Sequence, residues 1–346
     1  MKIVHVIFTL ETGGAESLLV DIVNAQARSH DVTLFVINDR YSDKLLSSIN
    51  PSVDICMLQR KPKTWSLLKI LKFNYMLYRI KPDIVHSHDA AIARLIFIRG
   101  LRKILTIHAL ELPTRNYFRY SALVAISHAV QCNVTANSSY LPHIIENGIN
   151  FNNVQTRTPC SLQGAISIVQ VARLDATTKG QDLLIRAAYR LSKQGIRISV
   201  TFIGEGASYE ALQVLVKKYN LTNSIQFLGR QSRSYVYSHL KQFDLMCHPS
   251  RYEGFGLTVV EGMAAGLPLL VSDTGGPYEL INKGQLGYCF QSESVDSLVE
   301  RILHIYKHYD EACELACRAR AYAMDKYSID KTVGAYEKLY LETLNQ

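Results

Sequence analysis

The stretch SRYEGFGLTVVEGMAAGLPLL, residues 250–270, decides how the rest of the chain is interpreted. Almost all of its residues are apolar or small, which predicts burial. Two carboxylates interrupt it, Glu253 and Glu261, with seven residues between them. Burying an unpaired carboxylate costs free energy, so each of the two needs a partner or a function.

A short helix is predicted inside this stretch, beginning at Gly256 or Leu257 and ending at Gly266. The amides at the start of a helix have no partner within it and can bind an anion; here they belong to Phe255, Gly256 and Leu257. Glu253 would precede the helix, and Glu261 would lie about 7 Å inside it at about 1.5 Å per residue. A nucleoside diphosphate sugar presents hydroxyls, a diphosphate and hydroxyls in the same order. The structural alternative is a capping Glu253 and a Glu261 bonded to a polar group of the core.

Length and composition indicate a folded protein of two domains. The chain has 346 residues, of which 48% are hydrophobic and 20% are charged, and these values argue against disorder. It contains no run of 18 apolar residues, so we expect no transmembrane helix. The N-terminal KIVHVIFTL is expected to be a first strand rather than a signal peptide.

The cysteines indicate the redox environment. Seven of them are scattered along the chain without a C-x-x-C motif, which predicts reduced thiols in a cytoplasmic protein. They are residues 56, 132, 160, 247, 289, 313 and 317.

Expected strands and helices alternate, which predicts an α/β fold with parallel sheets. The expected strands are 2–10, 31–38, 83–89, 103–110 and 122–130, then 166–174, 198–206, 225–229, 244–250 and 267–273. The polar segment 151–165, which contains Pro159 and Gly164, interrupts this pattern and predicts a linker. We therefore expect two doubly wound Rossmann-like domains facing a deep cleft, and ligands of such sheets bind beyond the carboxyl ends of the strands. The expected domains are residues 1–155 and 156–327, and a last helix, 328–346, is expected to pack back on the first.

Glycines follow two of the expected strands. Gly13 and Gly14 come after the first strand and open a helix, and Gly204 and Gly206 end a strand of the second half. Glycines let the backbone approach a ligand closely, and a helix N-terminus attracts phosphate. A plain turn explains Gly13 and Gly14 at least as well.

Two cations, Arg173 and Lys179, follow the first strand of the second half. Their position at the carboxyl end of a strand is suited to a diphosphate. A surface ion pair between Arg173 and Asp175 is the alternative.

The net charge of +8 is concentrated in residues 60–103, which hold eleven basic residues against two acids. In this region apolar residues such as Trp65 and Phe73 are interleaved with lysines such as Lys63. This composition predicts a helix lying on an anionic membrane face. A helix packed on the sheet with a solvated basic edge is the second interpretation, and a nucleic-acid patch is the third.

The motif at 253–261 resembles the E-x7-E signature of the retaining GT-B glycosyltransferases, glycosyltransferase family 4. The resemblance extends along nearly the whole chain. Its other landmarks are Thr12–Glu16, Thr106–His108, Ala125–Ser127, Glu146–Ile149, Val171–Leu174 with Lys179–Gly180, Gly204–Gly206 and Thr274–Ile281. Two departures are Ala172, where glycine is usual, and Gly262, where alanine is usual.

The resemblance implies roles for individual residues. Arg173 and Lys179 would hold the diphosphate and stabilise the leaving group. Glu253 would bind hydroxyls of the transferred sugar, Glu261 would bind the ribose, and His108 would lie near the reacting carbon. His86 and His88 are similar to His108, although either could simply cap its strand. The other implied substrate-binding residues are Gly13, Gly14, Ser127, Asn147, Gly204, Gly206, Phe255, Gly256 and Leu257.

The expected reaction is transfer of a hexose-type sugar from a UDP- or GDP-sugar, with no cofactor and no metal. The chain contains no Asp-x-Asp motif, so cations and a helix N-terminus would do the work of a metal. No carboxylate pair suits a double displacement, and the family implies retention by a same-face mechanism. By the resemblance, the first domain would bind the acceptor and the second would bind the nucleotide sugar.

The acceptor is expected to be a glycan or a lipid-linked molecule, as in assembly of bacterial lipopolysaccharide or capsule, with the protein cytoplasmic and peripheral on the inner membrane face. No nucleic-acid partner is expected. The alternatives are a GT-B-fold sugar-nucleotide epimerase and a non-catalytic scaffold that binds nucleotide sugar.

Overall fold

The computed structural model describes residues 1–62, 64, 66–158, 161–162 and 164–346, and these form two compact units. The first comprises Met1–Ile149 and Ile329–Gln346, and the second comprises Asn150–Ser328. Lys63 and Trp65 of the basic region, and Pro159 and Cys160 of the expected linker, lie outside the described residues.

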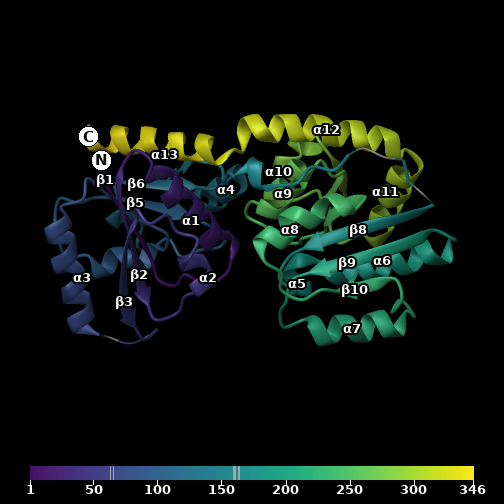
Figure 1. Cartoon of the computed structure of the whole chain (residues 1–346), viewed down its shortest axis with the longest axis horizontal. Helices are drawn as coiled ribbons and strands as arrows, with labels where there is room; N and C mark the ends of the chain where they lie inside the picture. Colours follow the sequence, from purple (N-terminus) through teal and green to yellow (C-terminus); the bar gives the residue numbers. More distant parts are fainter. Residues whose placement is uncertain (63, 65, 159–160, 163) are drawn as a thin grey trace. The chain divides into compact units, whose positions relative to one another are not determined.

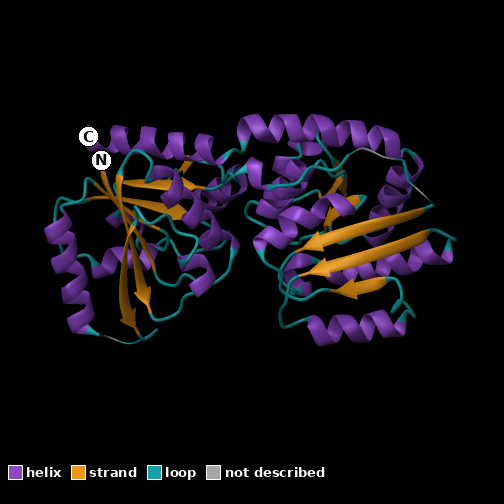
Figure 2. Ribbon diagram, viewed as in Figure 1, coloured by secondary structure: helices purple, strands orange, loops and turns teal. Residues whose placement is uncertain are grey.

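A parallel sheet forms the centre of the first unit (Figures 1 and 2). Its order is β3-β2-β1-β4-β5-β6-β7, so the chain leaves β1 toward one edge and returns beside it as β4. The strands are β1 (Lys2–Ile7), β2 (Asp31–Asn38), β3 (Asp54–Arg60), β4 (Ile84–Ser87), β5 (Arg102–Ile107), β6 (Ala122–Ala125) and β7 (His143–Ile144). The sequence did not predict β3, which is half-exposed at one edge, or β7, which has two residues at the other.

Helices cover both faces of this sheet. They are α1 (Gly14–Gln26), α2 (Asp43–Leu46), α3 (Leu67–Ile80), α4 (His128–Asn137), α13 (Ile329–Leu344) and the 3₁₀ helices η1 (Ala90–Leu95) and η2 (Tyr117–Arg119). The next 3₁₀ helix, η3 (Phe151–Asn153), belongs to the second unit. Side chains of β2 alternate between the faces, as the period of a strand requires. Leu34 and Val36 pack in the cluster that contains α1, whereas Phe35 and Ile37 pack with Phe73 of α3.

The second unit contains a parallel sheet of the same winding, β10-β9-β8-β11-β12-β13. Its strands are β8 (Ala165–Val171), β9 (Arg197–Ile203), β10 (Ile225–Phe227), β11 (Leu245–His248), β12 (Leu269–Ser272) and β13 (Tyr288–Phe290). Its helices are α5 (Ala176–Lys179), α6 (Gln181–Lys193), α7 (Tyr209–Lys218), α8 (Arg233–His239), η4 (Leu240–Gln242), α9 (Leu257–Ala265), α10 (Gly275–Leu280), η5 (Asn282–Gly284), α11 (Val295–Lys307) and α12 (Tyr309–Lys326).

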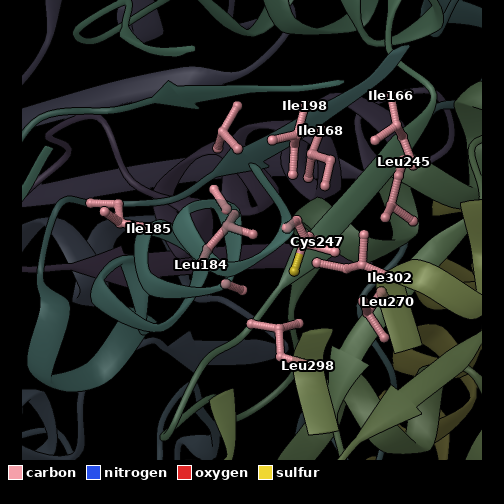
Figure 3. Packing of buried hydrophobic residues seen from close by; sticks show 14 of the residues in the cluster. Ile166, Ile168, Leu184, Ile185, Ile198, Leu245, Cys247, Leu270, Leu298 and Ile302 are labelled. Atoms are coloured by element: carbon pink, nitrogen blue, oxygen red, sulfur yellow. The ribbon is translucent and has the colours of Figure 1, made fainter. Parts of the chain in front are cut away.

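Apolar side chains from β8, β9, β11 and β12 meet those of α6 and α11 in the core of this unit (Figure 3). Ile168, Cys247 and Leu298 are fully buried there. Burial of Cys247 raises the pKa of its thiol, which keeps it protonated. The six cysteines among the described residues are all free thiols.

The division between the units falls after Ile149, six residues before the expected domain end at 155. The segment after it is held by the second unit: the Gln155 amide donates to the Tyr237 carbonyl, and the Arg157 amide donates to the Ala265 carbonyl. The Arg157 guanidinium also contacts the Asp244 carboxylate at 2.7 Å. At the other end, the Ile329 amide donates to the Ile149 carbonyl, and α13 packs beside α1 of the first unit.

Candidate functional site

The topological switch point of the second unit lies between β8 and β11, which are neighbours in the sheet but lead to opposite edges. Loops that leave such a pair diverge and form a crevice beyond the carboxyl ends of the strands. Here they are residues 172–180 after β8, which include the short helix α5, and residues 249–256 after β11. The expected Arg173, Lys179 and Glu253 all lie in these two loops.

Main-chain contacts hold the two loops together. The Thr178 carbonyl accepts hydrogen bonds from the amides of Arg251 at 2.8 Å and Tyr252 at 3.3 Å. Gly180 has a φ of +66°, and a Cβ added there would lie 2.0 Å from the Pro249 carbonyl oxygen. Only glycine fits this approach, which brings Lys179 beside the second loop.

An ion pair joins the loops. Lys179 Nζ lies 2.5 Å from Glu253 Oε2, with their side chains 18% and 21% exposed. His248, buried at the end of β11, places Nε2 3.3 Å from the same oxygen. Burial alone would raise the pKa of Glu253, but the hydrogen bond with His248 and the charge of Lys179 outweigh it and lower the pKa to about 2. Glu253 is therefore an ionised, preoriented acceptor.

The predicted helix is confirmed as α9, with Gly256 as its N-cap and Gly266 as its C-cap. Gly256 has a φ of +97°, a conformation that favours glycine. Glu261 is the fifth residue of α9 and is 9% exposed. Leu257 begins the helix, and Phe255 is buried before it, with its ring edge-to-face against Tyr327.

Glycine at position 262 has a packing reason. A Cβ added to Gly262 would lie 2.6 Å from Met246 Sδ and 2.9 Å from a Leu269 methyl carbon. The side chains of β11 and β12 thus occupy the space that an alanine would need. This accounts for the departure from the family pattern at this position.

Arg173, Gly204 and Gly206 lie at the same edge of the sheet. The Arg173 side chain is 69% exposed and pairs with Asp175 at 3.0 Å. This is the surface ion pair that the sequence allowed as the alternative to diphosphate binding. A Cβ at Gly204 would lie 1.9 Å from the Ala172 carbonyl oxygen, and a Cβ at Gly206 would lie 2.4 Å from the Leu174 carbonyl oxygen. These glycines therefore let the chain after β9 pack on the chain after β8, a role that the sequence did not predict.

The first unit carries four histidines in or just after the carboxyl-terminal halves of β1, β4 and β5. They are His5, His86, His88 and His108. This edge of the sheet is equivalent to the edge that carries the crevice in the second unit. His5 and His86 are fully buried, whereas His88 and His108 are half-buried. His5 Nδ1 lies 3.1 Å from His88 Nε2, and His88 Nδ1 lies 3.0 Å from His108 Nε2.

The hydrogen-bond network determines which nitrogen of each ring carries the proton. The Gln26 amide nitrogen donates to the Tyr340 hydroxyl, so the amide oxygen faces His5 Nε2 at 2.7 Å. A neutral His5 then donates from Nε2 and accepts at Nδ1. His88 must therefore donate from Nε2 to His5 and accept at Nδ1 from His108 Nε2. This order leaves the lone pair of His108 on Nδ1.

Burial keeps the four rings neutral. It lowers the pKa of both His5 and His108 to about 4 and holds the pKa of His86 and His88 well below the ordinary value. Nitrogens of His5, His86 and His88 lie within 4.8 Å of one another, a spacing that could hold a metal ion. Both His86 nitrogens, however, have hydrogen-bond partners, the Tyr340 hydroxyl and the Thr106 hydroxyl, each at 2.7 Å.

The remaining predicted residues of the first unit have local roles. Gly13 is the N-cap of α1, and Gly14 is its first residue. The Ser127 hydroxyl accepts a hydrogen bond from the Val130 amide and caps α4. Asn147 is buried, and its Oδ1 has no hydrogen-bond partner among the described residues.

The structure thus brings Lys179 and Glu253 into contact, and it adds residues that the sequence did not single out. His248 orients Glu253. Arg251 donates to the Ala176 carbonyl of the first loop and pairs with Asp182 of α6 at 2.8 Å. In the first unit, His5 belongs with the expected histidines. Its only sequence signal is a histidine near a strand end, like those at 86, 88 and 108.

Two doubly wound parallel sheets with polar groups at their switch points are the arrangement of nucleotide-binding α/β proteins. Residues 161–323 match the family glycosyl transferases group 1, and residues 12–153 match glycosyltransferase family 4. The chain belongs to these glycosyltransferases, whose GT-B fold it shares.

Individual relatives agree with this assignment. An uncharacterized glycosyltransferase of Methanocaldococcus jannaschii is 26% identical over 277 residues, covering 75% of each chain. The O-antigen biosynthesis glycosyltransferase WclY of Escherichia coli is 25% identical over 98% of each chain. The structure of Anabaena HepE in complex with UDP and glucose superposes with a TM-score of 0.82 at 20% identity, covering 98% of this chain and 99% of HepE.

Proposed function

We propose that this protein is a retaining, metal-independent hexosyltransferase. It transfers a sugar from a UDP- or GDP-sugar to a glycan or lipid-linked acceptor in the assembly of a surface polysaccharide. The observation that carries the proposal is the Lys179–Glu253 pair beside the N-terminus of α9, at the switch point of the second unit. WclY, a relative along nearly the full length, acts in O-antigen biosynthesis, and HepE binds UDP and glucose.

The charges of the second unit support this chemistry. Lys179 and Arg173 supply positive charge at the edge where a diphosphate would bind, and the start of α9 adds main-chain dipoles. Glu253 stays ionised over the physiological pH range and can accept hydrogen bonds from sugar hydroxyls. Cations and dipoles that are already in place stabilise a leaving diphosphate without reorganisation. Glu261 is proposed to bind the ribose.

Peripheral binding to an anionic membrane is part of the proposal, and α3 supports it. One face of this helix packs into the first unit through Ile70, Phe73 and Leu77. The other face exposes large apolar side chains between its basic residues, among them Leu68, which is 81% exposed. A helix of this kind can bind anionic lipid while remaining part of the domain. Among the described helices, none is long and apolar enough to cross a membrane.

Calorimetry with UDP, GDP and ADP in the presence of EDTA tests the donor site. The wild type should bind one of these nucleotides, and both Lys179→Ala and Glu261→Ala should weaken binding at least about tenfold, since each removes a charge-assisted contact. Lys193→Ala removes an equal charge from an exposed part of α6 and should bind like the wild type. Absence of nucleotide binding by the folded wild type would contradict the proposal.

Sedimentation with vesicles tests the membrane part separately. The wild type should sediment at low salt with phosphatidylglycerol vesicles and not with neutral ones. Leu68→Asn, which removes the most exposed leucine of α3, should reduce the bound fraction. No sedimentation of the wild type with the anionic vesicles would refute membrane binding.

A further inference from the structure

A pocket of about 370 Å³ opens in the first unit beside α3. Three arginines line it, each from a different segment. Arg60 ends β3, Arg94 belongs to η1 after β4, and Arg119 ends η2 after β5. The pocket therefore lies at the carboxyl edge of the sheet, where ligands of doubly wound domains bind. Its volume is within the range of small-molecule sites.

The charges of these arginines are not neutralised locally. Among the described residues, the lining contains no carboxylate, and none of the three arginines forms an ion pair. Arg119 also lies close enough to Lys103 to lower the pKa of that amine, an effect second to burial. Several cations gathered without a counter-charge repel one another, and an anionic ligand would relieve this repulsion.

Arg60 is already oriented toward such a ligand. Its Nε donates to Asn38 Oδ1 at 3.1 Å, and its guanidinium lies over the Phe8 ring, 5.3 Å from the centroid. Both contacts fix the plane of the guanidinium and use one of its five N–H donors. Burial lowers the pKa of Arg60, as expected for a cation held in the wall of a pocket.

The rest of the lining is mostly apolar. Phe8, Ile70 and Leu95 provide this surface, and Ile70 belongs to α3, the helix with an exposed apolar face. A molecule with an anionic head and a hydrocarbon part would use both kinds of lining. Three guanidinium groups match a diphosphate better than a single phosphate, because each can donate two hydrogen bonds.

We propose that this pocket binds the diphosphate of a lipid-linked acceptor, held by Arg60, Arg94 and Arg119. The inference rests on the proposed transferase function, for which it names the chemical class of the acceptor. The site is separate in the chain from the donor residues, which all belong to the second unit.

Geranyl diphosphate is a suitable probe because it is soluble and carries both groups. Calorimetry should show binding to the wild type, weakened at least about tenfold in the double variant Arg94→Gln/Arg119→Gln. Arg40→Gln/Arg115→Gln removes the same charge from exposed positions that do not line the pocket and should bind normally. Lys179→Met should also bind the probe normally, which excludes binding at the donor site.

Other outcomes would overturn the inference. Equal affinity for geranyl monophosphate would exclude recognition of a diphosphate, and equal affinity for inorganic pyrophosphate would exclude the lipid part. Equal losses in the pocket variant and in its control would exclude the arginines as the site. UDP calorimetry on the same samples separates the two proposals. If the wild type binds geranyl diphosphate but no nucleotide, the pocket is supported and the transferase function is contradicted.

Discussion

Acidification from pH 7 to pH 5 is expected to destabilise the first unit more than the second, because of its buried histidines. The pKa of both His5 and His108 falls from 6.5 to about 4 on folding. Between these values the unfolded state binds more protons than the folded state, so stability falls as the pH falls. The stabilisation is complete above about pH 6.5 and is lost progressively down to about pH 4.

The loss can be estimated for His5 and His108. At about 1.4 kcal/mol for each tenfold change in proton affinity, each contributes about 2 kcal/mol of destabilisation at pH 5 relative to pH 7. The two together amount to about 4 kcal/mol, and His86 and His88 add to it in the same direction. A domain is typically stable by about 5–15 kcal/mol, so the first unit should come close to unfolding. Glu253 stays ionised over this range, since its pKa is about 2.

Amide hydrogen exchange with mass spectrometry resolves the units. After correction for the intrinsic effect of pH, peptides from β1 and β4 should lose at least about 4 kcal/mol of protection, and peptides from β8 and β9 much less. His5→Asn should remove about 2 kcal/mol of this pH dependence, whereas His128→Asn, at an exposed position, should leave it unchanged. Equal losses in the two units, or full pH dependence in His5→Asn, would refute the reasoning.

Three further predictions concern single features. Gly180→Ala should lower the free energy of unfolding by more than about 2 kcal/mol, because the new Cβ clashes with the Pro249 carbonyl and the backbone is left-handed. Gly195→Ala, where φ is +79° and the space is open, should lower it by only about 1 kcal/mol. Equal losses in urea unfolding would exclude the clash. Nitrogen-15 NMR of labelled histidines should show His5, His88 and His108 with the proton on Nε2, and Gln26→Leu should disturb this order; a proton on His108 Nδ1 in the wild type would contradict the network. Arg157→Met should lower the free energy of unfolding in urea by about 3–5 kcal/mol, because it leaves the half-buried Asp244 without its cation. Arg28→Met, which breaks the exposed pair with Asp330, should lower it by less than about 1 kcal/mol. Similar losses in the two variants would refute the distinction between the buried and the exposed ion pair.

Local sequence patterns predicted much of the fold. Apolar runs and turn residues predicted the alternation of strands and helices, and glycines at both ends predicted the bounds of α9. The strand β3 was missed because its edge position leaves it half-exposed, without the apolar run of a central strand. The strand β7 has only two residues, too few to produce a pattern.

The sequence predicts those site residues that lie in the segment directly following a strand. Lys179, after β8, and Glu253, after β11, are of this kind. The site was not predictable where partners come from distant elements. The histidine order depends on Gln26 at the end of α1 and on Tyr340 of α13, which are 314 residues apart. No local pattern indicates that these two side chains meet, because the contact depends on the packing of α13 on α1.

The low pKa of His108 limits its role in the proposed reaction. Its Nδ1 lone pair can accept a hydrogen bond from a hydroxyl, but a pKa of about 4 makes the ring a weak base at neutral pH. A proton released by an acceptor hydroxyl would therefore end on a stronger base, and in a same-face mechanism the departing phosphate oxygen is available. His108 would then orient the reacting groups, and the buried chain from Gln26 through His5 and His88 would serve to hold its lone pair on Nδ1.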